Sequence, residues 1–181
     1  MRKVLYILGE LNDEDVEWMA ASGRRLVIGG VPLVLIHEGK PADDLFFVLD
    51  GHSTVSVAGV GDVARLGTGE VVGEMSFVDS APPSATVTAE PGSVVLALPK
   101  REMVNRLGKD VGFAARFYRA MAIFLADRLR SANTRGKSST SLGDRRIVED
   151  ELDEGLLDNV SLAGVRFERM LTVLSASRLE A

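Results

Sequence analysis

The chain has 181 residues, of which 46% are hydrophobic and 26% are charged, and its formal net charge is −5. The absence of cysteine excludes disulfides, thiolate metal sites and a thiol nucleophile, and two histidines are too few for a multi-histidine metal centre. Nucleic-acid binders usually carry a basic excess, so the acidic total lowers that expectation. The apolar run in the first eight residues is too short for a signal peptide or a membrane span, and a cytoplasmic protein is expected.

A helix is expected to begin after Asn12, because its side chain can cap the free amides and the acids at 13–15 sit at the positive end of the helix dipole. Gly23 is a suitable end for this helix. Trp18 is interpreted as the residue that packs this N-terminal helix against the β-rich part of the chain.

Between residues 24 and 99 the chain changes to short β-rich runs separated by glycine and proline. The runs are 26–28, 33–37, 45–49, 53–57, 63–66, 85–89 and 94–98. Seven or eight short strands at this spacing favour a sandwich or a roll over a βαβ sheet. The segments 39–44 and 58–61 have the composition of hairpin turns.

A helical region is predicted from residue 100 to about residue 133, with a break near Gly108. One apolar stripe contains Phe113, Phe117 and Phe124, and a second, neighbouring stripe includes Tyr118 and Leu129. The aromatic stripe is interpreted as core. A helix with so wide an apolar face needs a partner on its second side, so homodimerisation through residues 112–133 is expected.

Residues 134–144 have the composition of a flexible linker, and residues 145–181 are predicted to form a tail of one or two amphipathic helices. The expected division is therefore a domain at 1–133, with its β-rich part at 24–99 and closing helices at 100–133, followed by linker and tail. The tail is too small for an independent core.

The segment 73–87 carries the only chemistry that can be named from the sequence. A glycine and an acid, Gly73 and Glu74, open a short apolar turn, and a Pro-rich bend leads to Ser84, Ala85 and Thr86. Backbone N–H groups, small hydroxyls and one carboxylate suit a pocket for a sugar phosphate. Elsewhere no nucleophile is paired with a base, so an enzyme is the least favoured class, with no catalytic residues and no metal site expected.

In order and spacing, residues 5–133 resemble the cyclic nucleotide-binding domain of bacterial catabolite-activator-type proteins and of kinase regulatory subunits. The resemblance depends on Gly39, on the run 46–51, on the run 66–70 leading to Gly73 and Glu74, and on 85–87. It implies a mainly β fold with α: an antiparallel, jelly-roll-like β-roll flanked by an N-terminal helix and long C-terminal helices.

The resemblance also implies the site. Glu74 would accept a hydrogen bond from the ribose 2′-hydroxyl, the amides of a one-turn helix at 75–79 would face the cyclic phosphate, and the long helix would close over the base. The implied ligand is cyclic AMP first and cyclic GMP second, with no cofactor required. The expected ligand-binding residues are Val72, Gly73, Glu74, Met75, Ser76, Pro83, Ser84, Ala85 and Thr86.

One position departs from the family pattern. Family members that bind cyclic AMP tightly have an arginine where this chain has Pro83, and such a charge-assisted contact is typically worth about 1.5–3 kcal/mol. Arg65 is the nearest arginine in sequence. The pocket could therefore be weaker, altered or degenerate. For Ser84 and Thr86, ligand contact and hydrogen bonding to the local backbone remain equal alternatives.

Three functions follow from these observations. The first is a non-enzymatic regulatory module that binds a cyclic nucleotide and signals through its C-terminal helices to a partner protein. The second is a structural or assembly protein with a degenerate pocket. The third, a transcription regulator, is disfavoured because residues 137–181 hold six Lys/Arg against nine Asp/Glu and are short for a winged DNA-binding arrangement.

Overall fold

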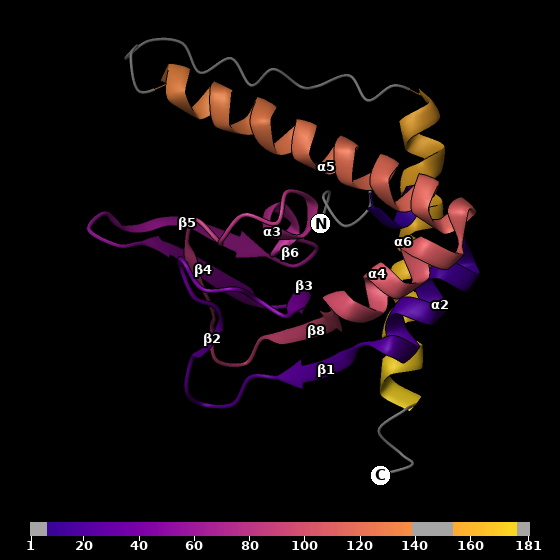
Figure 1. Ribbon diagram of the computed structural model, residues 1–181, viewed down its shortest axis with the longest axis horizontal. Helices are drawn as coiled ribbons and strands as arrows, with labels where there is room; N and C mark the ends of the chain where they lie inside the picture. The colour runs from indigo at the N-terminus through magenta and orange to yellow at the C-terminus, as the bar shows by residue number, and fades with distance from the viewer. Residues whose placement is uncertain (1–6, 139–153, 177–181) are drawn as a thin grey trace.

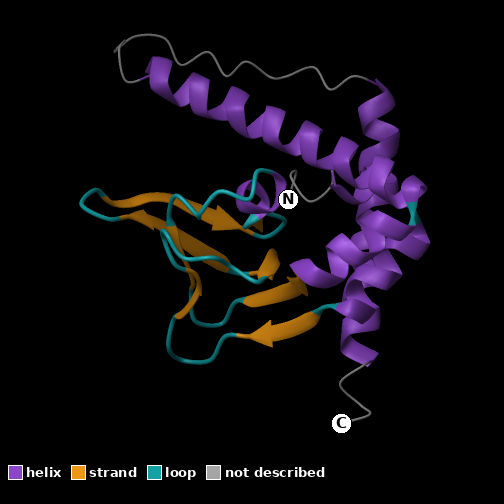
Figure 2. Ribbon diagram, viewed as in Figure 1, coloured by secondary structure: helices purple, strands orange, loops and turns teal. Residues whose placement is uncertain are grey.

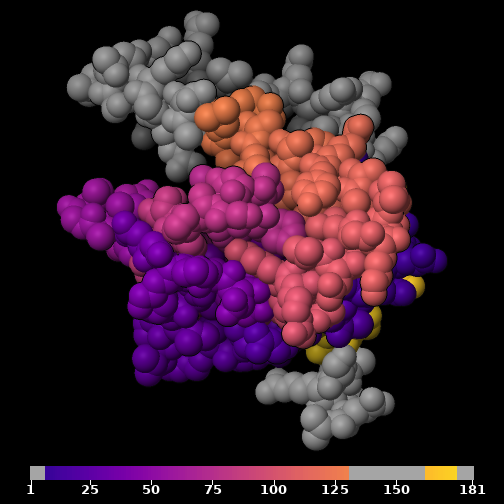
Figure 3. Space-filling view, viewed as in Figure 1, coloured from indigo at the N-terminus to yellow at the C-terminus, as the bar shows by residue number. Residues whose placement is uncertain are grey.

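The structure, a computed structural model, describes residues 7–138 and 154–176 (Figure 1). The strands gather in a β-roll on one side, and the helices α2, α4 and α6 lie together at the other end (Figures 1 and 2). The long helix α5 extends from that helical end back across the roll. In the space-filling view the surface of α5 borders directly on that of the roll (Figure 3).

Two four-stranded antiparallel sheets form the roll, with strand orders β1-β8-β3-β6 and β2-β7-β4-β5. The strands are β1 (Arg24–Val27), β2 (Leu33–Ile36), β3 (Asp44–Asp50), β4 (His52–Val57), β5 (Gly61–Gly67), β6 (Val71–Val72), β7 (Thr86–Ala89) and β8 (Val94–Pro99). The expected fold class, an antiparallel β-roll flanked by helices, is confirmed. The two-residue strand β6 was not resolved as a separate run in the sequence, because it is too short to show alternation.

The two segments expected to be hairpin turns differ in the structure. Residues 58–61 do join the paired strands β4 and β5, with a left-handed φ of 77° at Gly59. Residues 39–44 instead join β2 to β3, which lie in different sheets, so the hairpin prediction for this segment was wrong. Turn-forming residues indicate that the chain reverses, but not which sheet receives the next strand.

Helix α2 (Asp13–Ser22) begins and ends as expected from its sequence. Asn12 and Asp15 form a capping box, in which each side chain accepts a hydrogen bond from the other residue's backbone N–H. The N–H of Gly23 then donates to the carbonyl of Met19 at the end of the helix. Trp18 meets the ring of Phe113 edge-on, with 5.6 Å between centroids, and packs against the core that also contains Phe47 and Leu96 of the roll.

The closing helices are α4 (Lys100–Lys109) and α5 (Val111–Ser138), and they meet at Asp110, two residues after the expected break. Phe113, Phe117 and Phe124 are fully buried, as their common stripe predicted. They share one core with Phe47 and Leu96 of the first sheet. The aromatic face of α5 is therefore held against the roll, which fixes the helix across it.

Helix α6 (Glu154–Ala176) packs against α2. Ala163, Met170 and Leu174 are buried in the same core as the aromatic residues of α5. Arg166 and Arg169 both pair with Asp13 of α2. Helix α5 continues to Ser138, past the expected start of the linker, and residues 139–153 and 177–181 lie outside the described residues, so the proposed domain division stays a prediction.

Candidate functional site

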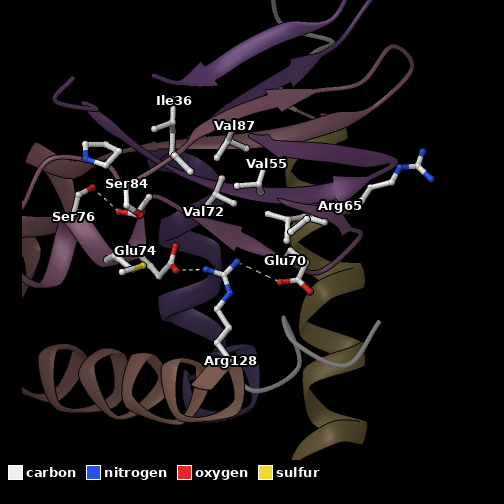
Figure 4. Close-up of a pocket in the computed structure, with 16 residues that line it drawn as sticks. Ile36, Val55, Arg65, Glu70, Val72, Glu74, Ser76, Ser84, Val87 and Arg128 are labelled. Atoms are coloured by element: carbon white, nitrogen blue, oxygen red, sulfur yellow. Dashed lines mark hydrogen bonds and ion pairs between the residues drawn. The ribbon is translucent and has the colours of Figure 1, made fainter. Parts of the chain in front are cut away.

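A cavity of about 620 Å³ lies between the roll and α5, with the short helix α3 (Glu74–Val78) at its edge (Figure 4). Aliphatic side chains from both sheets cover much of its wall, and the polar groups gather near α3 and α5. The lining residues are Ile36, Val55, Ala64, Arg65, Leu66, Glu70, Val72, Gly73, Glu74, Met75, Ser76, Pro83, Ser84, Ala85, Val87 and Arg128.

The structure brings nearly all of the predicted binding residues to this one cavity. Val72, Gly73, Glu74, Met75, Ser76, Pro83, Ser84 and Ala85 line it. Thr86 is the exception: its hydroxyl accepts a hydrogen bond from the N–H of Glu38 at 3.1 Å. This donor is 48 positions away in the sequence and is not part of the local backbone. Contact of the predicted residues with a ligand stays a prediction.

Gly73 sets the position of the acid that follows it. Its φ is 87°, in the left-handed region that favours glycine, and it is the residue before the first turn of α3. A Cβ here would lie 3.3 Å from the carbonyl oxygen of Asp44 and 3.3 Å from Cδ1 of Ile36. Both the turn and the close approach therefore need a residue without a side chain.

Glu74 is the buried acid of the cavity, with only 2% of its surface exposed. Burial raises the pKa of its carboxyl group, and the nearby charge of Arg128 acts against that rise. The guanidinium of Arg128 donates a hydrogen bond to this carboxylate (Figure 4). A buried acceptor at the end of β6 can thus bind a hydroxyl or a cation that enters the cavity.

Arg128 extends from α5 into the cavity, between Glu74 and Glu70 (Figure 4). It also donates to the carbonyl of Val71 at 3.2 Å and lies 3.6 Å from a carboxylate oxygen of Glu70. Sequence reasoning missed this arginine because α5 was interpreted through its apolar stripes. The spacing carried a signal, because Arg128 follows Phe124 by four residues and so shares a helix face with it. In the structure, the guanidinium carbon of Arg128 lies 4.9 Å from the centre of that ring.

Pro83, Ser84 and Ser76 form another part of the wall. The N–H of Gly39 donates to the carbonyl of Pro83 at 2.8 Å, which ties the β2–β3 connection to this loop. The Ser76 hydroxyl donates to the carbonyl of Gly73 at 3.2 Å and accepts from Nζ of Lys100 at 2.9 Å. Figure 4 shows Ser76 beside Ser84.

Arg65, the last arginine before Pro83 in the sequence, does not direct its charge into the cavity. Its guanidinium makes two hydrogen bonds to the carboxylate of Glu90, at 2.9 and 2.6 Å, and its side chain points away from the cavity (Figure 4). These bonds hold the pKa of Glu90 at about 2, helped by a hydrogen bond from Thr54. The direction of Arg65 could not be predicted from its place in the sequence.

Comparison with known proteins agrees with this geometry. Residues 33–110, which hold the two glutamates of the cavity, match the sequence model of the cyclic nucleotide-binding domain. Residues 33–110 form a domain of the cyclic nucleotide-binding family. The resemblance seen in the sequence is therefore confirmed.

Solved structures share the fold over most of the chain. A cyclic nucleotide-binding domain from Methylobacillus flagellatus is 22% identical with a TM-score of 0.64, over 80% of this chain and 85% of that one. The N-terminal domain of a transcriptional regulator from Streptomyces coelicolor is 29% identical with a TM-score of 0.56, over 80% and 99%. The catabolite activator protein of Thermus thermophilus is 21% identical with a TM-score of 0.58, over 95% and 87%.

The cyclic nucleotide-binding domain family is regulatory and generally non-catalytic. In the described part of the chain, no cluster of His, Asp and Glu side chains could hold a metal ion. Among residues 7–138 and 154–176, no helix is long and apolar enough to cross a membrane.

Proposed function

We propose that this domain is a non-enzymatic, cytoplasmic regulatory module that binds a cyclic nucleotide, cyclic AMP in preference to cyclic GMP. The observation that carries the proposal is the buried carboxylate of Glu74, held by Gly73 in the wall of a cavity of about 620 Å³. A pocket of this size with aliphatic walls and a few convergent polar groups is typical of a small-molecule site.

In the proposed complex, Glu74 accepts a hydrogen bond from the ribose 2′-hydroxyl. The backbone N–H groups at the beginning of α3, together with Ser84 and Ala85, face the cyclic phosphate, and the base lies against the aliphatic wall. A ligand hydroxyl that donates to this carboxylate in place of Arg128 keeps the buried charge hydrogen-bonded, and leaving it without a partner would be costly.

The signal in this proposal passes through α5. Arg128 ties α5 to Glu74, so a ligand hydroxyl that donates to the same carboxylate competes with the guanidinium. The ligand would then shift the population of α5 positions by its different affinity for each of them. Helix α5 and the segment after it are proposed to bind a second copy of the chain and a partner protein. Nucleic acid is not a proposed partner.

Calorimetric titration with cyclic AMP and cyclic GMP tests the proposal. Binding of cyclic AMP should weaken roughly tenfold or more in Glu74→Gln, since the carboxylate is a stronger acceptor than an amide. Glu102→Gln is the matched control, because it removes an acid from α4 that does not line the cavity and should leave affinity unchanged. If titration gives no heat, and millimolar ligand does not raise the melting temperature, the proposal is overturned.

A second candidate function is favoured by one specific observation, the proline at position 83. Without a cation at that position, the described charges of the cavity wall that point inward are two carboxylates and Arg128. A wall of this charge opposes an anionic ligand. In this alternative the roll is a structural or assembly element, and wild-type protein fails to bind either nucleotide while still assembling.

A further inference from the structure

Among the described residues that line the cavity, none places a cation at the end where Ser76 and Ser84 lie. Arg128 is engaged by Glu74 and by the carbonyl of Val71, and Arg65 is engaged by Glu90 outside the cavity. Among the lining residues that the structure describes, these are the two basic side chains. A phosphate placed near Ser76 and Ser84 would therefore need its positive partner from behind the wall.

Lys100 occupies such a position. It is the first residue of α4, and its backbone N–H donates to the carbonyl of Asp43, which fixes it at the end of β8. Its Nζ donates to the hydroxyl of Ser76 at 2.9 Å, and Ser76 lines the cavity. The ammonium is thus one hydroxyl away from the space that a phosphate would occupy.

We infer that Lys100 is the phosphate-end cation of this domain, acting as a positioning residue through Ser76 in place of an arginine at position 83. The inference rests on the proposed function and adds the source of positive charge that it needs. An ammonium that donates to a hydroxyl polarises it and makes it a better donor. The Ser76 hydrogen, which now points to the carbonyl of Gly73, can then turn to a phosphate oxygen.

The surroundings of Lys100 agree with this role. Burial lowers the pKa of its ammonium, while the carboxylates of Asp43, Glu74 and Asp44 act in the opposite direction. Two of these acids come from β3 and its connection, and Glu74 comes from α3. An anion at Ser76 would act in the same direction as these carboxylates and raise the pKa of Lys100, because it favours the charged form.

Replacement of the charge tests the inference on the full chain. Lys100→Met should weaken binding of cyclic AMP roughly tenfold, and Lys100→Arg should restore most of the affinity. Lys109→Met is the matched control, because it removes a lysine from the exposed end of α4 and should leave affinity unchanged. If Lys100 acts through Ser76, adding Ser76→Ala to Lys100→Met should weaken binding little further.

A second measurement on the wild-type protein separates an electrostatic role from a structural one. The pKa of Lys100, followed by NMR of its Nζ or Cε resonance, should rise when cyclic AMP is added. Unchanged affinity of Lys100→Met, or an unchanged pKa of Lys100 in a wild-type protein that binds cyclic AMP, would overturn the inference and leave the proposed function standing.

The two proposals also fail separately. If wild-type protein binds neither cyclic nucleotide, the proposed function is overturned. The role of Lys100 is then tested by following its pKa during titration with inorganic phosphate. A saturable rise in its pKa that Ser76→Ala abolishes would retain Lys100 as an anion-site cation. No response to phosphate would overturn the inference as well.

Discussion

At the scale of single residues, the proline at position 83 is expected to affect ligand affinity. Its side chain lines the cavity, while its carbonyl accepts the hydrogen bond from Gly39. An arginine at this position would keep the carbonyl and add a charged donor. The substitution would therefore retain the contact with Gly39 and place a cation at the cavity wall.

Pro83→Arg should tighten binding of cyclic AMP by roughly one to two decades, since a charge-assisted contact is worth about 1.5–3 kcal/mol. Arg65→Met should leave affinity within about twofold of wild type, because that guanidinium is engaged by Glu90 and points away from the cavity. Calorimetric titration of each variant with cyclic AMP measures both affinities. Unchanged affinity of Pro83→Arg would show that the phosphate does not lie near this loop.

At the scale of elements, one buried carboxylate joins three helices. Asp15 of α2 is fully buried and accepts hydrogen bonds from Arg106 of α4, at 2.8 Å, and from Arg116 of α5, at 2.7 and 3.1 Å. Arg106 also stacks over the rings of Trp18 and Phe113, at 4.6 and 4.2 Å. This cluster fixes where α5 begins, and through α5 it fixes where Arg128 lies.

Asp15→Asn should lower the free energy of unfolding by about 3 kcal/mol or more, because it leaves two arginines facing a neutral group at a buried position. Asp13→Asn is the control: Asp13 is on the same helix and also pairs with two arginines, but it is 55% exposed, and its loss should cost about 1 kcal/mol or less. Urea denaturation measures both. Equal decreases in the free energy of unfolding for the two variants would contradict the conclusion that Asp15 holds α2, α4 and α5 together.

The sequence predicted the elements better than the connections between them. Local signals, such as the Asn12 cap and the aromatic stripe of α5, depend on residues close in sequence, and the structure confirms both. The residues 39–44 have similarly strong turn signals, but they join different sheets, which depends on pairing with strands far along the chain. Local chemistry cannot specify such a partner.

The residues of the candidate site were likewise predicted where they are close in sequence, and missed where distant segments come together. The segment 72–76 and the loop 83–85 could be predicted, because glycine, acid and small residues stand close together in the sequence and all line one cavity. Arg128 was not predicted, because its approach to Glu74, 54 positions away in the sequence, depends on the packing of α5. The direction of Arg65 away from the cavity likewise depends on Glu90, a partner 25 positions away.

At the scale of the whole molecule, α5 retains an apolar face that neither the roll nor α6 covers in the described part of the chain. Tyr118 is 49% exposed and Leu129 is 63% exposed, although Phe117 and Phe124 beside them are fully buried. Both exposed residues belong to the second stripe predicted from the sequence. We expect this face to pair with α5 of a second copy, since two such faces can together exclude the apolar surface from water.

The double substitution Tyr118→Glu with Leu129→Glu should therefore convert a dimer to a monomer, because it places two charges where apolar side chains would meet. Val165→Glu is the control, since Val165 is an equally exposed apolar residue on α6, at 67%, and its substitution should leave the dimer intact. Light scattering at high protein concentration measures both. A wild-type monomer would contradict the α5 interface, and a dimer lost only in Val165→Glu would move the interface to α6, away from the helix that carries Arg128.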